Sequence, residues 1–265
     1  MTPDRAPATP SSSASPVHTQ LHAWLVALDL PDDQVAGLAG LLDATELAAA
    51  NRFAFEADRR RHIVAHAALR DILSRYTGIP LEALAFESGP QGKPFLAEGL
   101  SPVPPSFNLA HGGELALVGV AAAGDVGVDI ELRRPIPDLD ALARRVLSAA
   151  EQDQLASLCA GDRLDGFLAA WTRKEAVVKA IGVGLQLPLD AFDVRLDPSG
   201  AAELLAMRAP EGQGRWWCVA FRPDRGYHAA VAVRGAVVSG WRVVRWEGPG
   251  KPSSVDGVDM TLAAG

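Results

Sequence analysis

Two long segments with helical periodicity, each ended by a glycine, set the plan of this chain. In the first, EADRRRHIVAHAALRDILSRYT, apolar residues recur every three or four positions and Gly78 follows. The second is DGFLAAWTRKEAVVKAI, and Gly182 ends it. Each segment is accompanied by several short strand-like runs. We therefore expect an α+β fold of two similar subdomains, each a small sheet packed on a long helix, with the functional site in the cleft between them.

Strand-like runs and composition together place the subdomain boundaries. The predicted strands are 21–28, 107–111, 114–123, 124–132, 191–196, 216–221 and 228–233. Segments 1–17 and 247–265 are rich in Pro, Ser, Gly or Asp and have little to bury, so they are expected to be flexible tails. The subdomains between them are expected at 18–123 and 124–246.

Composition argues against several classes of protein. The formal net charge of −7 is unlike that of a general nucleic-acid binder, which carries excess positive charge. The two cysteines, Cys159 and Cys218, form no CxxC pair, so neither a disulfide scaffold nor a cysteine zinc site is expected. No apolar run approaches the roughly 20 residues of a membrane span, and the N-terminal stretch has no apolar signal segment. We therefore expect a cytoplasmic protein that binds neither nucleic acid nor membrane.

A pair of histidines lies on the first long helix. His62 and His66 are four residues apart and share one helical face, as the histidines of an HExxH motif do. Position 63 is Ile, so the glutamate of that motif is missing, and no third metal ligand is evident. The pattern favours a packing or surface histidine pair.

Two carboxylates mark the predicted strand GVDIE (127–131). Alternate residues of a strand face one side, so Asp129 and Glu131 share a face while their neighbours face the core. Carboxylates so close repel each other unless a cation lies between them or they point into water. Mg²⁺ fits such a pair, because it takes oxygen ligands and leaves positions for water and phosphate. The alternative is a solvated edge strand, in which this alternation is common.

A helical stripe carries a third carboxylate and a lysine. Trp171, Glu175 and Lys179 fall at positions i, i+4 and i+8 of WTRKEAVVK (171–179). One interpretation is a surface Glu–Lys pair of little energetic weight. The bulky Trp171 favours instead a position at a buried margin. There Glu175 would bind a metal or act as a base, and Lys179 would contact a phosphate oxygen.

Taken together, these segments resemble a known family. Their order along the chain is GKP (92–94), FNLAH (107–111), GVDIE (127–131), WTRKEAVVK (171–179) and GVGL (182–185). Only four of the 25 basic residues are lysines, and three of the four fall inside these segments, as expected where a compact ammonium is needed. Over roughly residues 45–235 the chain resembles the 4′-phosphopantetheinyl transferases of the surfactin-synthetase-activating type.

The resemblance implies a monomer with pseudo-twofold symmetry that binds coenzyme A in the cleft between its halves. It implies an enzyme that moves the phosphopantetheine arm of coenzyme A onto a serine of an apo acyl or peptidyl carrier protein and releases adenosine 3′,5′-bisphosphate. The metal would be Mg²⁺ or Mn²⁺. The carriers would belong to fatty-acid, polyketide or nonribosomal peptide biosynthesis.

The resemblance also implies roles for individual residues. Asp129, Glu131 and Glu175 would hold the metal. Glu175, which would deprotonate the carrier serine, and Lys179, which would stabilise the leaving phosphate, would be catalytic. Arg61 would bind the 3′-phosphate. The full set of coenzyme contacts would be Arg52, Arg61, Gly92, Lys93, Pro94, Ala110, His111, Asp129, Lys174, Glu175 and Lys179.

The chain departs from the family pattern at three places. Ala110 stands where a small hydroxyl residue often precedes the histidine, and Gly112 stands where a second hydroxyl is common. Positions 47–50, basic in many members, are Leu, Ala, Ala and Ala. Fewer direct hydrogen bonds to the coenzyme phosphates are therefore expected.

Two other functions stay open on the sequence. A Mg²⁺-dependent phosphohydrolase would use the same carboxylates with water as nucleophile, although such enzymes usually show two metal sites. A non-catalytic module would bind coenzyme A or carrier proteins, although a decayed site should have lost Asp129, Glu175 or Lys179.

Overall fold

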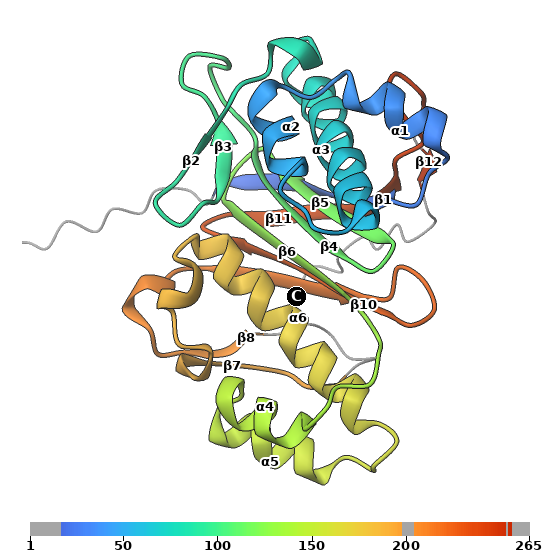
Figure 1. Cartoon of the computed structure of the whole chain (residues 1–265). Helices are drawn as coiled ribbons and strands as arrows, with labels where there is room; N and C mark the ends of the chain where they lie inside the picture. The colour runs from blue at the N-terminus through green and yellow to red at the C-terminus, as the bar shows by residue number, and fades with distance from the viewer. Residues whose placement is uncertain (1–16, 198–203, 253, 256–265) are drawn as a thin grey trace, which may run out of the picture.

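The computed structural model describes residues 17–197, 204–252 and 254–255. Two halves stack on each other, each with a long helix packed on a sheet (Figure 1). The layers run helix, sheet, sheet, helix, because the two sheets face each other and each long helix covers the outer face of its own sheet. The expected fold class is therefore confirmed. Of the tails expected at 1–17 and 247–265, residues 1–16, 253 and 256–265 lie outside the described residues.

The first half is built on a five-stranded sheet. Its elements are β1 (His18–Ala27), α1 (Asp32–Ala39), α2 (Ala44–Ala50), α3 (Glu56–Thr77), β2 (Phe86–Ser88), β3 (Pro94–Leu96), β4 (Ser106–Gly112), β5 (Leu115–Ala121), β11 (Val237–Arg245) and β12 (Ser254–Val255). The sheet order is β12-β11-β1-β5-β4, and β2 and β3 form a separate hairpin. Helices α1, α2 and α3 lie over one face of the sheet (Figure 1), where Val26, Ile63 and Val118 belong to one buried cluster.

The second half is built on a three-stranded sheet. Its elements are β6 (Asp125–Leu132), α4 (Leu139–Val146), α5 (Ala149–Ser157), α6 (Arg163–Ile181), β7 (Phe192–Val194), β8 (Leu204–Met207), β9 (Trp216–Phe221) and β10 (Tyr227–Arg234). The sheet order is β6-β10-β9, with antiparallel neighbours. Helix α6 crosses its outer face (Figure 1), where Phe167, Val177 and Ala230 share a buried cluster.

Both long helices end as the sequence predicts. Gly78 after α3 and Gly182 after α6 adopt left-handed φ angles of 70° and 80°. Their N–H groups donate to the carbonyl oxygens of Ser74 and Val178, which closes the last turn of each helix. Glycine takes this conformation without a steric penalty, so each helix ends at its glycine.

The alternation along β6 places its carboxylates. Val126, Val128 and Ile130 are buried between the two sheets. The residues between them must then face α6, because successive side chains of a strand point to opposite faces. Asp129 and Glu131 therefore lie on the α6 side of β6, which confirms that they share one face.

Side chains of β4 join the two sheets at their edges. The Oγ of Ser106 accepts a hydrogen bond from the N–H of Val126 at 3.0 Å, and Oδ1 of Asn108 accepts one from the N–H of Val128 at 2.9 Å. An edge strand otherwise leaves such N–H groups unpaired. The two bonds hold FNLAH beside GVDIE, so the motifs of both halves meet at one seam.

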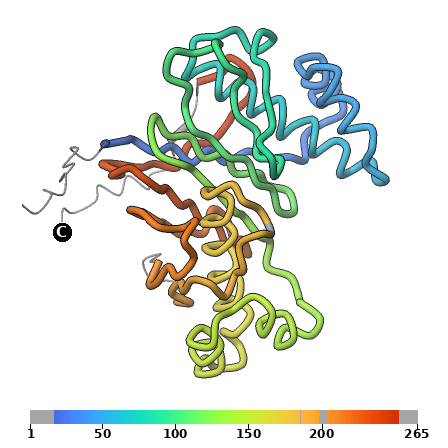
Figure 2. Tube along the Cα trace, turned by 90° about the vertical axis from the view of Figure 1, so that its left-hand side faces the viewer, coloured from blue at the N-terminus to red at the C-terminus, as the bar shows by residue number. Residues whose placement is uncertain are grey.

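The last described strands depart from the expected boundaries. Strand β11 pairs in parallel with β1, so it belongs to the first sheet although it falls within 124–246 (Figure 2). The stretch after it is anchored rather than loose: Nε1 of Trp246 and the N–H of Gly250 both donate to the Asp71 carboxylate, at 2.8 and 3.2 Å. The described part of the expected C-terminal tail is thus packed on α3.

Candidate active site

A glycine lets helix α6 approach strand β6. A side chain at Gly127 would overlap the backbone of Ala176 and Ala180 on α6. Only glycine fits this close approach. The first residue of GVDIE therefore sets the distance at which the carboxylates of β6 meet α6.

The carboxylates of β6 contact the partly exposed stripe of α6. The Nζ of Lys179 lies 2.6 Å from Oδ1 of Asp129. The Nε1 of Trp171 donates to Oε1 of Glu131 at 3.2 Å. Within 171–180, Trp171, Glu175 and Lys179 are the residues that are not fully buried, and the rest of the helix surface is enclosed. The stripe predicted from the sequence therefore lies at a buried margin, beside both carboxylates.

Burial and mutual repulsion act on the three carboxylates. Burial raises the pKa of Asp129, against the attraction of Lys179. Burial also raises the pKa of Glu131, and the negative charge of Asp129 adds to this rise. The pKa of Glu175 is raised by burial, opposed by Lys179 and reinforced by Asp129. All three groups thus sense a shared environment that is short of positive charge.

The first half contributes His111 to this environment. It follows Ala110 at the end of β4, and burial lowers its pKa, with further lowering by the positive charges of Lys179 and Arg61. Arg61 itself is held by Asp29, at 2.9 Å from Nε to Oδ1. The charges of Lys179 and Arg61 are therefore close enough to His111 to act on it, and Arg52 is exposed just before α3.

The GKP segment lies at the seam between the halves. The Nζ of Lys93 donates to the carbonyl oxygens of Val126 and Ala180, at 2.8 and 3.1 Å. Burial lowers the pKa of Lys93 to about 8. Lys93 and Pro94 line a cavity of about 280 Å³ together with the C-terminal end of α6, while Gly92 turns the hairpin with a φ of 81°. The lysine thus ties the β2–β3 hairpin to the second half.

Lys174 is not placed as expected. Its side chain is fully buried and its Nζ lies 2.7 Å from Oε2 of Glu151. The same ammonium donates to the carbonyl oxygens of Leu189 and Phe192. Lys174 directly precedes Glu175, and neighbouring residues of a helix lie on different faces. The ammonium of Lys174 is therefore turned away from the seam. In this structure the Lys174 ammonium therefore holds Glu151 and two backbone carbonyls, and its expected contact with the coenzyme stays a prediction.

Two of the departures from the family pattern have a steric explanation. The side chain of Ala110 is buried in the layer between the sheets, where a hydroxyl group would need a hydrogen-bond partner, so the expected contact of Ala110 with the coenzyme could come only from its backbone. At Gly112 a Cβ would overlap the carbonyl oxygen of Ile130 on β6. No hydroxyl side chain fits at position 112 while β4 and β6 are this close.

The donor chemistry of the carboxylates suits a divalent cation. Oδ2 of Asp129 is buried and has no hydrogen-bond partner, so it has unused capacity. Carboxylate oxygens are the ligands that Mg²⁺ prefers. Within the described part of the chain, however, no three His, Cys, Asp or Glu side chains are already gathered closely enough to hold a metal. The carboxylates fit the ion by their chemistry and by the spare oxygen of Asp129.

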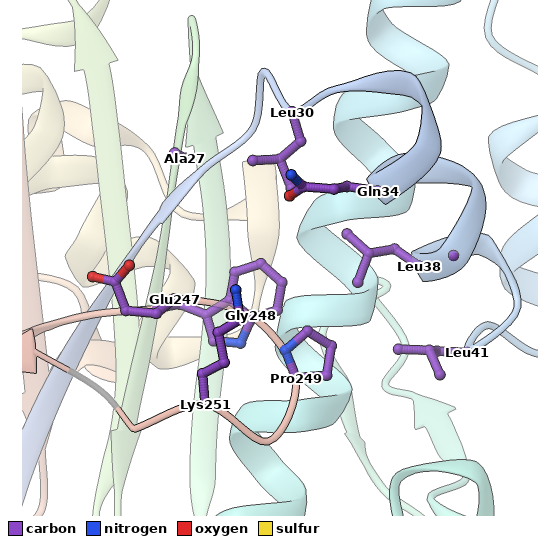
Figure 3. Close-up of a pocket in the computed structure, with 11 residues that line it drawn as sticks. Ala27, Leu30, Gln34, Leu38, Leu41, Glu247, Gly248, Pro249 and Lys251 are labelled. Atoms are coloured by element: carbon purple, nitrogen blue, oxygen red, sulfur yellow. The ribbon is translucent and has the colours of Figure 1, made fainter.

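Cavities elsewhere differ in character. A cavity of about 200 Å³ beside Glu131 and Trp171 is lined mainly by apolar side chains. A groove of about 780 Å³ lies between α1 and residues 246–251 (Figure 3) and contains no residue predicted for the site. Among the described residues, no helix is long and apolar enough to cross a membrane.

The sequence did not indicate the residues that hold the strands and the helix of the site in place. Asn108 and Ser106 join the strands, and Glu151 receives Lys174. The isolated amide of Asn108 among the apolar residues of FNLAH could have indicated a buried hydrogen bond. Nothing local marks Glu151, because its partner is distant in the sequence.

Comparisons with known proteins agree with this arrangement. The family profile of the 4′-phosphopantetheinyl transferase superfamily matches residues 125–232, and that of the 4′-phosphopantetheinyl transferase N-terminal domain matches 31–124. The chain is 36% identical over 227 residues to the 4′-phosphopantetheinyl transferase HetI of Nostoc sp. strain PCC 7120, which covers 86% of this chain and 92% of that protein. The chain belongs to the 4′-phosphopantetheinyl transferase superfamily.

Two further relatives of the transferase come from Bacillus. It is 34% identical to the 4′-phosphopantetheinyl transferase psf-1 of Bacillus pumilus, over 76% of this chain and 82% of that protein. It is 29% identical to Sfp of Bacillus subtilis strain 168, over 68% and 76%. These relatives confirm the expected family and the expected enzyme. They also favour transfer of phosphopantetheine to carrier proteins over the two alternatives, a phosphohydrolase and a non-catalytic binding module.

Proposed function

We propose that this transferase binds coenzyme A along the seam between its halves, with the diphosphate near His111 and Lys179, and delivers the phosphopantetheine arm to an apo acyl or peptidyl carrier protein. The observation that carries this proposal is the convergence of Asp129, Glu131, Glu175 and Lys179 from two distant segments. Lysine and histidine beside a polyanion supply the charge neutralisation that phosphoryl transfer requires.

Asp129, Glu131 and Glu175 would hold a Mg²⁺ ion. When bound, the ion would neutralise charge on the diphosphate. The spare Oδ2 of Asp129 supports this assignment, as does the raised pKa of each carboxylate, because a cation would relieve the repulsion that burial intensifies.

Glu175 would accept the proton of the carrier serine. The serine oxygen forms a bond to the phosphorus that carries the pantetheine arm, and the bond from that phosphorus to the bridging diphosphate oxygen breaks. Adenosine 3′,5′-bisphosphate leaves with the electron pair of the broken bond, and the serine proton passes to Glu175. Burial raises the pKa of Glu175, which makes the carboxylate a stronger base.

Lys179 would stabilise the leaving phosphate. Its ammonium is held by Asp129 on the margin of α6, with 31% of the side chain exposed. It is therefore both positioned and accessible, as a group that stabilises developing charge must be.

The test is transfer to a carrier. Purified protein is mixed with coenzyme A, Mg²⁺ and an apo carrier domain, and the carrier is weighed by mass spectrometry. A mass gain of one phosphopantetheine, abolished by a chelator and by Glu175→Gln, supports the proposal. Glu98→Gln serves as the matched control, because Glu98 is exposed and outside the seam, and it should retain full activity.

Three outcomes would count against parts of the proposal. Transfer that persists in the presence of a chelator would contradict the proposed metal site. Full activity of Glu175→Gln would show that Glu175 is not the base. Phosphate release without any mass gain on the carrier would replace transfer with hydrolysis.

A further inference from the structure

Two backbone carbonyl groups at the seam point away from the regular hydrogen bonding of their own elements. Strand β6 is an edge of the three-stranded sheet, and the N–H of Val126 points outward from it to Oγ of Ser106. The carbonyl oxygen of Val126 points to the same side, as it does in any antiparallel strand. Ala180 stands in the last turn of α6, where carbonyl groups have no partner within the helix. Each of these two oxygens therefore needs a donor from another element.

Lys93 of the β2–β3 hairpin donates to both oxygens at once. Its Nζ lies 2.8 Å from the carbonyl oxygen of Val126 and 3.1 Å from that of Ala180. Its aliphatic stem crosses the glycine that ends α6, because a Cβ at Gly182 would lie 3.4 Å from Cδ of Lys93. One ammonium of the first half thus joins the edge of β6 to the end of α6.

The chemistry of a lysine suits this position. An ammonium is compact and carries three N–H groups, so it can donate to two carbonyl oxygens that belong to different elements. A positive charge is also favoured at the C-terminal end of a helix, where the helix dipole is negative. Burial lowers the pKa of Lys93 to about 8, so the side chain still carries its charge at pH 7. The position accounts for one of the only four lysines in this chain.

The two acceptors of this ammonium lie next to the residues of the site. Ala180 directly follows Lys179 on α6. Val126 stands three residues before Asp129 on β6. Between them, Gly127 lets the strand and the helix touch, since a Cβ there would overlap the backbone of Ala180. A shift of either element at this point would therefore move the Lys179 ammonium relative to the Asp129 carboxylate, which now lie 2.6 Å apart.

We propose that Lys93 is a positioning residue of the transfer reaction. Its ammonium holds β6 against the end of α6 and so keeps Lys179 and Asp129 in the arrangement that transfer requires. It acts through these two residues and not through a contact of its own with the coenzyme phosphates. This role rests on the proposed function and adds the side chain by which the first half controls the geometry of the second.

Loss of the ammonium should affect the reaction and coenzyme binding differently. Lys93→Met keeps an unbranched side chain of similar length and removes the charge and the donors. The rate constant of carrier modification, at saturating coenzyme A and carrier, should fall by about tenfold to a hundredfold, because a misplacement of about 1 Å at the reacting groups has an effect of this size. The Kd of coenzyme A, measured by isothermal titration calorimetry without carrier, should change by less than about threefold, because no coenzyme contact is lost.

Hydrogen exchange measures the loosening of the seam in the free protein. In Lys93→Met, the amide hydrogens of peptides covering 125–132 and 176–182 should exchange about tenfold faster than in the wild type, because local opening becomes easier there. Peptides from α3 should be unchanged. This measurement needs neither coenzyme nor carrier, so it tests the link between β6 and α6 independently of the proposed function.

Chemical rescue tests whether the ammonium itself is required. Lys93→Cys, in a Cys159→Ser background, is alkylated with 2-bromoethylamine, which restores an ammonium on a side chain as long as that of lysine. Cys159 is replaced because it is exposed, whereas burial raises the pKa of the Cys218 thiol to about 12 and keeps it unreactive. The aminoethylated protein should regain the rate constant of Cys159→Ser to within about threefold, and the protein alkylated with bromoethane should not.

Lys251→Met is the matched control. Lys251 is exposed and lines the groove beside α1, apart from the seam. Its variant should keep the rate constant and the exchange pattern of the wild type. If Lys93→Met does not fold, Lys93→Gln takes its place, because glutamine keeps an N–H donor without the charge. The same split between rate constant and coenzyme affinity is then expected.

Several results would overturn the positioning role. A Kd of coenzyme A that rises tenfold or more in Lys93→Met would make Lys93 a coenzyme contact. An unchanged rate constant, or unchanged exchange in β6 and α6, would show that the ammonium does not hold the site. Equal rescue by bromoethane would leave only a packing role. A wild-type protein that transfers no phosphopantetheine would instead contradict the proposed function, and the exchange measurement would still decide whether Lys93 holds β6 to α6.

Discussion

The ammonium of Lys179 lies 2.6 Å from Oδ1 of Asp129, although the two residues are fifty positions apart in the chain. Only 7% of the aspartate side chain is exposed, and its second oxygen has no partner. A half-satisfied buried carboxylate costs stability, and such groups concentrate at functional sites. The pairing holds Asp129 in place and still leaves one oxygen for a ligand.

Asp129→Asn should separate activity from stability. Because burial raises the pKa of Asp129, the folded protein disfavours its ionised form, and a neutral side chain of the same shape is tolerated. A raised carboxyl pKa means that stability is lost as the pH rises through the folded value. The unfolding temperature of the variant at pH 8 should therefore equal or exceed that of the wild type, while transfer falls by roughly a hundredfold or more.

The matched control for that variant is Asp125→Asn. Asp125 lies at the start of the same strand but pairs with Arg234 at the surface, with 51% of its side chain exposed. Its free energy of unfolding should change by less than about 0.5 kcal/mol. Retained transfer in Asp129→Asn would show that this carboxylate is not part of the reaction.

Lys174→Met should destabilise the protein strongly. Lys174 and Glu151 are both fully buried, and removal of the ammonium leaves the carboxylate without its partner. The expected loss is about 3–5 kcal/mol, measured by urea unfolding. The KM for coenzyme A of the folded variant should be unchanged, because the ammonium is turned away from the seam.

A double variant controls for packing at this pair. Glu151→Gln/Lys174→Met removes both charges and should be less destabilised than Lys174→Met alone. A KM that rises severalfold in Lys174→Met, with stability preserved, would show that Lys174 contacts the coenzyme.

Periodicity predicted those parts of the site that depend on one element. The two-residue repeat of GVDIE placed Asp129 and Glu131 on one face, and the spacing of Trp171, Glu175 and Lys179 placed them on one stripe. The glycines after the long helices predicted their ends. These features follow from local geometry, so the residues themselves carry the information.

Features that depend on contacts between distant segments could not be predicted in this way. Lys174 belongs to a motif of the site, but its position on α6 directs it to Glu151. Strand β11 pairs with β1 across most of the chain, and the absence of room at Gly112 arises from the neighbouring strand β6. In each case the partner is set by the fold and leaves no local pattern.

Gly127→Ala should disrupt the contact between β6 and α6. Its methyl group would overlap the backbone of Ala176 and Ala180, so the helix or the strand must shift. The free energy of unfolding should fall by about 1–3 kcal/mol or more, and transfer should fall with it because Lys179 moves relative to Asp129. Differential scanning calorimetry and the carrier assay measure the two effects.

Gly161→Ala provides the comparison for that substitution. A Cβ at Gly161 meets no atom within 4 Å. Its stability should stay within about 0.5 kcal/mol of the wild type. Equal behaviour of the two alanine variants would mean that close approach at Gly127 is not required.

His22 should make the stability of the first half sensitive to acid. The ring of His22 forms a hydrogen bond with the hydroxyl of Tyr76. Burial, with a contribution from Arg242, lowers the pKa of His22 to about 4. The unfolded chain binds a proton near pH 6.5, whereas the folded chain does not, so stability falls as the pH drops from 6.5 toward 4. His22→Asn removes this titration.

The difference in free energy of unfolding between wild type and His22→Asn measures the effect. Below pH 6.5, the free energy of unfolding of the wild type should fall relative to that of His22→Asn. The upper limit of this fall is about 1.4 kcal/mol per pH unit, and the actual fall should be smaller because the ring is only half-buried. Urea unfolding at pH 7.5, 6.0 and 5.0 gives the difference at each pH. The lost bond to Tyr76 adds a constant offset that does not depend on pH. A difference that stays constant across this range would show that the folded protein accepts a proton on His22 as readily as the unfolded chain does.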